Sequence, residues 1–228
     1  MSIAENIQTI LSRIDTVAKE CGRDPKDIQL VAVSKLFPAS AIDEAIKAGQ
    51  LVFGENYIQE AEKKIDELGS RCRFHFIGHL QSNKAKIAAR LFDVIETVDS
   101  VKLARTLSRH LQDLGRTMKI LLQVNIGEDE NKSGLAAAET EKLFREIREL
   151  PNIEIIGLMT MPPFTDDPED ARPYFQQLRE LSQQLKDQGL FPQEQKIELS
   201  MGMSNDYHVA IQEGATIVRV GTAIFGHR

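Results

Sequence analysis

Two hydrophobic patterns alternate along the chain. Short continuous apolar runs, rich in valine and isoleucine, are typical of β-strands that are covered on both faces. The segments between them carry apolar residues at the three- and four-residue spacing of amphipathic helices. About eight strand-length runs are present, near Gln29–Ser34, Leu51–Gly54, Arg73–Ile77, Val94–Val98, Lys119–Asn125, Glu154–Met159, Lys196–Ser200 and Thr216–Val220. The pattern predicts an α/β protein built from repeated strand–helix units.

Glycines mark the ends of several helical segments. Helical spacing covers Ala39–Ala48, Val101–Leu114, Ala136–Leu150 and Asp170–Gln188. A helical pattern ends just before each of four glycines, as it does at C-terminal caps: Gly49, Gly69, Gly115 and Gly189. Eight strand–helix steps favour a closed parallel (β/α)8 barrel, a TIM barrel, over an open doubly wound sheet.

The two ends of the chain modify this barrel. The segment Ile224–Arg228 comes just after the last predicted strand, which leaves no room for an eighth following helix. An additional helix near Ser2–Cys21 precedes the first strand. Because the first and last strands of a barrel are neighbours, we expect this N-terminal helix to complete the outer ring. No linker or shift in composition divides the chain, so we expect a single domain over residues 1–228.

Composition excludes several classes of function. The 228 residues suffice for a substantial core, and 34 acidic against 28 basic residues give a net charge of −6. No basic stripe is interleaved with aromatic residues, so we expect no nucleic-acid partner. A secretory signal and an apolar run of roughly 20 residues are both absent from the sequence, so we expect a cytoplasmic protein that does not enter a membrane. Cys21 and Cys72 are too few for a disulfide framework and are interpreted as reduced thiols.

Lys35 comes directly after the apolar run Leu30–Ser34, at the carboxyl end of the first predicted strand. Active sites of closed parallel barrels form at these strand ends. Desolvation there lowers the pKa of a lysine amine, and the neutral amine is a nucleophile toward aldehydes. The alternative interpretation is a lysine that simply reaches solvent from a loop.

Arg219 lies between two valines within the last predicted strand. A charge in a buried strand needs a partner, either a carboxylate such as Glu198 or a ligand in the barrel interior. Gly221 and Thr222 form a small turn after it, where barrels often bind phosphate, and we expect Ser204–Asp206 to cap a short helix nearby. An amine together with an anion-binding turn points to a phosphorylated aldehyde, pyridoxal 5′-phosphate (PLP).

Other polar groups favour simpler interpretations. His75 and His79 are four residues apart, but no third ligand accompanies them, so we expect no metal. The acidic segment 127–134 lacks the spacing of an EF-hand and is interpreted as a solvated lid. Methionines near the ends of the sixth and seventh predicted strands are interpreted as packing residues, some of which line a ligand: Met159, Met161, Met201 and Met203.

Six segments carry a resemblance to a known family. They are Val31–Lys35, Phe53–Tyr57, Phe74–Lys84, Gly157–Met161, Leu199–Ser204 and Arg219–Gly226. In this order they resemble the signatures of the pyridoxal phosphate homeostasis proteins, which are related to the N-terminal barrel domain of alanine racemase. The resemblance extends over essentially the full chain.

The resemblance implies a modified TIM barrel of PLP fold type III, with PLP bound as an imine to Lys35. It also implies that Asn56 lies by the cofactor ring and that Arg219 faces the pyridine nitrogen. His79 and Met159, which follow or end predicted strands, are added to the expected cofactor contacts. The positions matching the phosphate site, and those near it, are Ser200, Gly221 and Thr222, with Met201, Gly202 and Ser204.

The function implied is a PLP carrier that serves vitamin B6 and amino-acid homeostasis. An arginine stays protonated, so Arg219 would keep the pyridine nitrogen unprotonated and make PLP a weak electron sink. Alanine racemases add a tyrosine base from a second domain, and we expect no such domain after Arg228. We therefore expect no catalytic residues and little or no turnover. The alternatives are a PLP-dependent amino-acid racemase and an aldolase-like phosphosugar barrel.

The expected partners are PLP itself and, as recipients, apo forms of PLP-dependent enzymes. Charged residues cover the outward faces of the predicted helices, which favours a monomer. The clearest example is the set Glu139, Glu141, Lys142, Arg145, Glu146 and Arg148.

Overall fold

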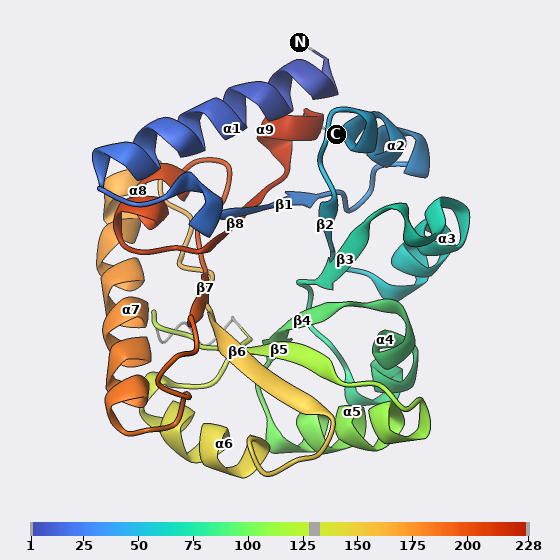
Figure 1. The fold of residues 1–228 in the computed structure, drawn as a ribbon, viewed down its shortest axis with the longest axis vertical. Helices are drawn as coiled ribbons and strands as arrows, with labels where there is room; N and C mark the ends of the chain where they lie inside the picture. Colours follow the sequence, from blue (N-terminus) through green and yellow to red (C-terminus); the bar gives the residue numbers. More distant parts are fainter. Residues whose placement is uncertain (1, 128–132, 227–228) are drawn as a thin grey trace.

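Eight parallel strands form a closed barrel in the computed structural model, which describes residues 2–127 and 133–226. Each strand pairs with the next one in sequence, and β8 pairs with β1 to close the barrel (Figure 1). The strands are β1 (Gln29–Val33), β2 (Val52–Glu55), β3 (Arg73–Phe76), β4 (Val94–Val98), β5 (Met118–Gln123), β6 (Ile153–Met159), β7 (Glu198–Ser200) and β8 (Ile217–Val220). The predicted TIM barrel is thus confirmed, with strand ends displaced by one or two residues at most positions.

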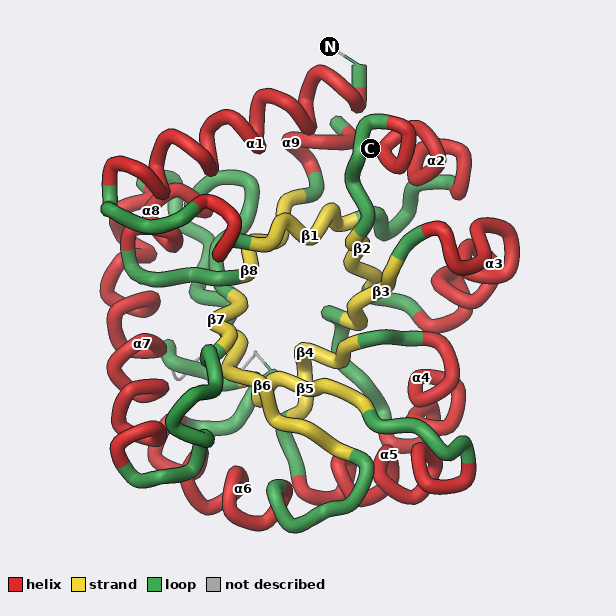
Figure 2. The backbone as a smooth tube through the Cα atoms, in the orientation of Figure 1, coloured by secondary structure: helices red, strands yellow, loops and turns green. Residues whose placement is uncertain are grey.

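Helices surround the barrel as an outer ring (Figure 2). They are α1 (Ile3–Glu20), α2 (Ala39–Lys47), α3 (Ile58–Leu68), α4 (Ala85–Leu91), α5 (Val101–Asp113), α6 (Thr140–Ile147), α7 (Arg172–Asp187), α8 (Tyr207–Gln212) and α9 (Thr222–Phe225). Short 3₁₀ turns cover Pro25–Asp27, Gly69–Arg71, Ser82–Lys84, Ala137–Glu139 and Pro168–Ala171. In the described part of the chain, none of these helices is long and apolar enough to cross a membrane.

The N-terminal helix α1 completes the ring beside β1 and β8, as predicted. It packs against α2, α8 and α9 (Figure 1). Its apolar stripe includes Ile7, Ile10 and Ile14, and a capping box between Ser2 and Glu5 begins it.

The expectation that no helix follows the last strand was wrong. The single helical turn α9 follows β8 and packs against α1. The Asn6 amide of α1 donates a hydrogen bond of 2.8 Å to the Ile224 carbonyl of α9. A helix of one turn is too short to produce a periodic hydrophobic pattern, so the pattern analysis could not detect it.

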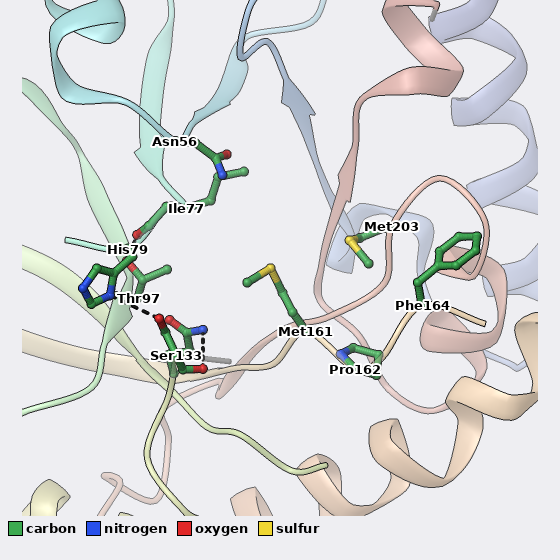
Figure 3. A pocket seen from close by; sticks show the side chains of 11 residues that line it. Asn56, Ile77, His79, Thr97, Ser133, Met161, Pro162, Phe164 and Met203 are labelled. Atoms are coloured by element: carbon green, nitrogen blue, oxygen red, sulfur yellow. Dashed lines mark hydrogen bonds between the residues drawn. The ribbon is translucent and has the colours of Figure 1, made fainter. Parts of the chain in front are cut away.

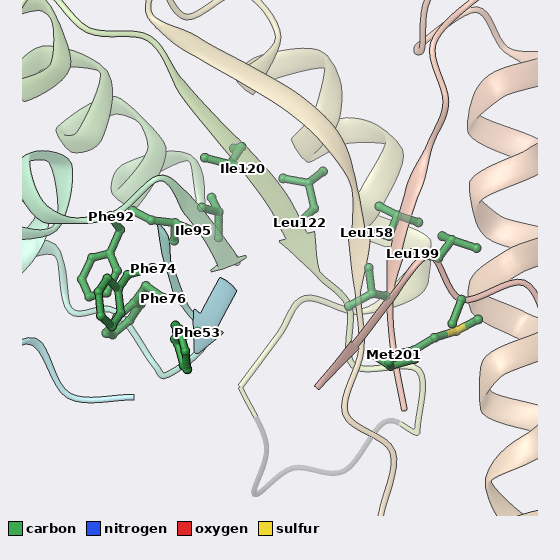
Figure 4. Close-up of a cluster of buried hydrophobic side chains, with 14 of the residues drawn as sticks. Phe53, Phe74, Phe76, Phe92, Ile95, Ile120, Leu122, Leu158, Leu199 and Met201 are labelled. Atoms are coloured by element: carbon green, nitrogen blue, oxygen red, sulfur yellow. The ribbon is translucent and has the colours of Figure 1, made fainter. Parts of the chain in front are cut away.

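Most of the core lies between the barrel and the helices. The outward side chains of the strands, among them Phe53, Phe74 and Leu158, pack against the apolar faces of the helices (Figure 4). A second cluster of apolar side chains lies inside the barrel: Val31, Val52, Val94, Leu121, Met159 and Ile217. Because side chains alternate along a strand, Arg219 faces the interior two residues after Ile217. The barrel interior therefore holds this apolar cluster together with the polar Arg219, whose register partner on β1 is Val31 of the cluster.

Candidate functional site

Two adjoining cavities open at the carboxyl ends of the strands. The smaller has a volume of about 250 Å³ and is lined by Lys35 and Arg219, among others. The larger, about 420 Å³, is lined by Asn56 and His79. Phe164 and Met203 line both, so the cavities share a wall. Figure 3 shows Asn56 and His79 on one side of the larger cavity and Met203 and Phe164 on the other.

Lys35 reaches the smaller cavity from the end of β1. Its neighbour Ser34 is fully buried, while Lys35 itself is half-buried and lines the cavity wall. The apolar strand fixes the backbone up to this point, so the amine is presented at a defined end of the barrel. The structure therefore places Lys35 just after the end of β1, in the wall of this cavity.

The turn after β8 lies in the same cavity. Ser204, Gly221 and Thr222 all line it, and the Gly221 N–H donates to the Ser204 hydroxyl over 3.3 Å. A Cβ on Gly221 would lie 3.3 Å from the Val33 Cβ, so glycine lets this turn pass close to the end of β1. The close approach brings the turn and Lys35 to one cavity.

Glycine at position 202 is required for a different structural reason than glycine at position 221. Its φ is +91°, and a Cβ there would lie 2.5 Å from the Ala210 Cβ. The turn after β7 therefore needs glycine to pack against α8. Asp206 occupies the N-cap of α8, but its carboxylate accepts the Met203 N–H over 2.6 Å. Asp206 is thus the N-cap residue of α8, as predicted, but its side chain bonds the preceding turn and not α8. The Ser204 hydroxyl instead accepts the Gly221 and Ala223 N–H groups at the start of α9.

Arg219 is held in a buried polar network that crosses the barrel. Its guanidinium donates to the Ser200 hydroxyl and to the Thr160 carbonyl, the latter over 2.8 Å. Ser200 in turn donates to Glu96, whose carboxylate lies 3.9 Å from Arg219 and also bonds His75 over 2.6 Å. Glu198, the carboxylate suggested as a partner, instead accepts a hydrogen bond from Thr216, so Glu96 takes the expected role.

The network keeps both Glu96 and Arg219 in their charged forms. Burial acts to raise the pKa of the Glu96 carboxyl, but hydrogen bonds from His75 and Ser200 and the charges of His75 and Arg219 lower it below its ordinary value. Burial lowers the pKa of Arg219, opposed by Glu96 and Asp206, and arginine begins from so high a value that it stays charged. Glu96 therefore supplies the negative charge that a buried guanidinium requires.

Asn56 and His79 line the larger cavity. The Asn56 side-chain oxygen is buried and has no hydrogen-bond partner among the described residues. A buried polar atom without a partner is rare, and a bound group would satisfy it. His79 Nδ1 lies 3.2 Å from the Ser133 hydroxyl (Figure 3).

The remaining predicted contacts lie outside both cavity walls. Met159 is buried in the apolar barrel interior, and Met201 is buried in the core outside the strands. Ser200 is fully buried, and its hydroxyl is engaged by Arg219 and Glu96. The structure thus brings together Lys35, Ser204, Arg219, Gly221 and Thr222 in one cavity, while contacts of Met159, Ser200, Met201 and Gly202 with a cofactor stay predictions.

Sequence reasoning missed Glu96. It stands in the apolar run of β4 as Arg219 stands in β8, and a charge inside a buried strand was the signal available. Phe164, which is 78% exposed and lines both cavities, left no such signal.

Possible metal ligands do not gather in the described ranges 2–127 and 133–226. They hold no group of three histidine, cysteine or acidic side chains that could bind a metal. His75 is instead bonded to Glu96, and His79 to Ser133. Most of the acidic segment interpreted as a lid, residues 128–132, lies outside the described residues.

Comparison with known proteins identifies the family. Residues 5–228 match the alanine racemase N-terminal domain. Relatives from Vibrio alginolyticus and Escherichia coli K12, both named pyridoxal phosphate homeostasis protein, are 43% and 42% identical to this chain. The matches cover 100% and 99% of this chain, and 98% and 97% of the relatives. This chain belongs to the pyridoxal phosphate homeostasis protein family.

Solved structures agree with this family assignment. PipY from Synechococcus elongatus, solved with PLP bound, has a TM-score of 0.86 and 39% identity, covering 99% of this chain and 100% of PipY. An unknown protein from Bifidobacterium adolescentis has a TM-score of 0.91 and 37% identity, covering 97% and 94%. An alanine racemase from Clostridium difficile, at 18% identity and TM-score 0.71, shares the fold over 98% of this chain and 60% of its own.

Proposed function

We propose that this homeostasis protein binds PLP in the smaller cavity and carries it as an imine on Lys35. The observation that carries the proposal is the convergence of Lys35, Arg219 and the Gly221–Thr222 turn on one cavity. The naming of the relatives and the PLP bound to PipY support the same ligand. An amine, a buried cation and an anion-binding turn match the aldehyde, ring nitrogen and phosphate of PLP.

Each residue has a role in this proposal. The Lys35 amine forms a C=N bond with the aldehyde, and the aldehyde oxygen leaves as water. Ser204, Gly221 and Thr222 hold the phosphate, and Arg219 faces the ring nitrogen. Asn56, whose oxygen has no partner among the described residues, lies by the ring from the adjoining cavity.

The protein is proposed to be a carrier with little or no turnover. When bound, PLP stabilises substrate carbanions by drawing electrons into a protonated ring. Arg219 is buried and charged, and its pairing with Glu96 retains that charge. A guanidinium only donates, so the ring nitrogen opposite it stays an acceptor without a proton. The site is therefore suited to holding PLP for vitamin B6 and amino-acid homeostasis more than to racemisation.

The first experiment is to record the visible spectrum of the purified protein, reduce it with borohydride and locate the modified peptide by mass spectrometry. We expect an imine trapped on Lys35, and none in Lys35→Ala. A protein that stays colourless and unmodified after PLP is added would overturn the proposal. Rapid Lys35-dependent loss of α-deuterium from alanine would instead favour a racemase.

We also propose that the barrel is one domain that works as a cytoplasmic monomer and passes PLP to apo enzymes. Charged, exposed side chains on the outer face of α6, such as Glu141 and Arg145, support a solvated surface there. Light scattering during gel filtration measures the mass of the protein in solution, and we expect the mass of a single chain. Transfer of PLP to an apo-aminotransferase faster than release into buffer would support direct delivery.

A further inference from the structure

A buried cluster of charges lies behind Lys35, outside both cavities. Lys64 of α3 has a side chain that is only 6% exposed. Its ammonium donates to the Ser34 carbonyl, to Glu55 and to Glu60, each over 2.7 Å. A lysine has three N–H donors, so all of them are used. Lys64 is thus fixed in place and is not a second amine available to an aldehyde.

The cluster holds the peptide groups on both sides of Lys35. On one side, Lys64 binds the Ser34 carbonyl, and the Ser34 hydroxyl donates to Glu55 over 2.6 Å. On the other side, the Leu36 N–H donates to Glu60 over 2.5 Å. The carboxylates of Glu55 and Glu60 both accept a hydrogen bond from the Lys64 ammonium. Lys35 therefore projects from a backbone segment that α3 holds at two points.

The held segment has an unfavourable backbone conformation. Leu36 has a φ of +66°, in the left-handed region that residues with a Cβ rarely adopt. Its side chain is 58% exposed, so packing of the leucine does not account for this conformation. Two hydrogen bonds act on it: its own N–H donates to Glu60, and the Phe37 N–H donates to the Ser34 carbonyl over 3.1 Å, which closes a turn around Leu36. Strain of this kind persists only where the surroundings enforce it.

We propose that Lys64, through Glu55 and Glu60, is a positioning residue for the Lys35 amine. It keeps residues 34–36 in the conformation that directs Lys35 into the cofactor cavity. Lys64 lines neither cavity of the site, so it acts through the backbone and not by contact with the ligand. The inference rests on the proposed imine at Lys35. It adds that the hydrogen bonds around residues 34–36 orient the amine that forms this imine.

The test compares Lys64→Met with Lys63→Met, the exposed neighbour on the same helix. Two probes are titrated: PLP, whose aldehyde reacts with the amine, and pyridoxamine 5′-phosphate, which has the same ring and phosphate but no aldehyde. For Lys64→Met we expect PLP imine formation to weaken about tenfold and pyridoxamine phosphate affinity to change less than twofold. Lys63→Met is expected to match the parent with both probes.

Three results separate the explanations. An equal loss for both probes in Lys64→Met would show a general structural role and overturn the inference. So would unchanged imine formation. An unmodified parent protein would overturn the proposed function itself, and this inference with it, before any variant is compared.

Glu60 provides a second route if Lys64→Met does not fold. Its side chain is 23% exposed, so its replacement leaves less of the core disturbed. Glu60→Leu removes the acceptor of the Leu36 N–H, whereas Glu60→Gln keeps an oxygen there. We expect Glu60→Leu to weaken imine formation several-fold without affecting pyridoxamine phosphate, and Glu60→Gln to restore most of it. Equal behaviour of the two variants would contradict the positioning role.

Discussion

Single residues in this site are placed by the strand ends that carry them. Lys35 and Thr222 come from opposite ends of the chain, yet both line the smaller cavity because β1 and β8 are neighbours in the closed barrel. Gly221 favours this close approach, because a Cβ there would lie 3.3 Å from the Cβ and the carbonyl oxygen of Val33. The chemistry of the site therefore depends on one amine and one turn that only barrel closure brings together.

Thr222 allows a test at this scale. It is exposed and lines the cavity, and among the described residues its hydroxyl has no hydrogen-bond partner. Thr222→Val should weaken PLP binding by about 1 kcal/mol, roughly fivefold, for one lost hydrogen bond. Thr222→Ser, which keeps the hydroxyl, is the control and should bind like the parent. Equal affinity of all three proteins, measured by fluorescence titration, would place the phosphate elsewhere.

Among the elements, α1 has an unusual position. It precedes the first strand, yet it occupies the ring where β1 and β8 meet. Two contacts hold it there. The Asn6 amide donates to α9, and the guanidinium of Arg23, just after α1, donates to the carbonyl of Ile211 in α8 and to that of Ala215 after α8. An element at the start of the chain thus covers the segment around the proposed phosphate turn.

Ile14 tests the contribution of α1 to stability. It is 3% exposed in the core, whereas Leu11 on the same helix is 39% exposed. Ile14→Ala should lower the free energy of unfolding by about 2–5 kcal/mol, because it removes buried methyl groups and leaves a cavity. Leu11→Ala should cost less than about 1 kcal/mol. Urea unfolding measures both, and similar losses would mean that α1 does not pack as described.

At the scale of the whole molecule, one polar network links opposite walls of the barrel. His75 and Glu96 belong to β3 and β4, and Ser200 and Arg219 belong to β7 and β8. Figure 2 shows these two pairs of strands on opposite sides of the barrel. All are buried, so removal of one charge leaves the others without compensation. The network thus couples the proposed ring-nitrogen contact to the integrity of the barrel.

The pH dependence of stability should report on Glu96. Its pKa in the folded protein is below the ordinary value of 4.5, so its stabilisation is present above that pH and is lost as pH falls through the lowered pKa. Glu96→Gln should cost about 3 kcal/mol at pH 7, and the difference from the parent should shrink below pH 4.5. Urea unfolding across pH 3–7 measures it.

A control isolates this effect from the other carboxyls. Burial raises the pKa of Glu55 and Asp206, so the parent curve alone mixes opposing contributions. The comparison with Glu96→Gln removes them because both proteins contain these groups. Glu62→Gln, at the exposed pair with Arg90, should change stability by less than about 1 kcal/mol. A difference between parent and Glu96→Gln that does not vary with pH would contradict the assignment.

The sequence by itself determined the elements and the kind of chemistry. Continuous apolar runs and helical spacing specify strands and helices through contacts between near neighbours, so the eight strands, α1 and the strand-end position of Lys35 were all predictable. The family motifs pointed to PLP, and Arg219 was recognisable as a buried charge because valines flank it.

Only the tertiary structure decided which residues meet. The pairing of Arg219 with Glu96, in place of Glu198, depends on which side chains face inward at one level of the closed barrel. The hydrogen bond from Lys64 to the backbone carbonyl beside Lys35 depends on how α3 packs against the end of β1. Such contacts join segments far apart in sequence, and strand register and barrel closure select them. No local pattern encodes that choice, which is why the surroundings of Lys35 emerged only with the fold.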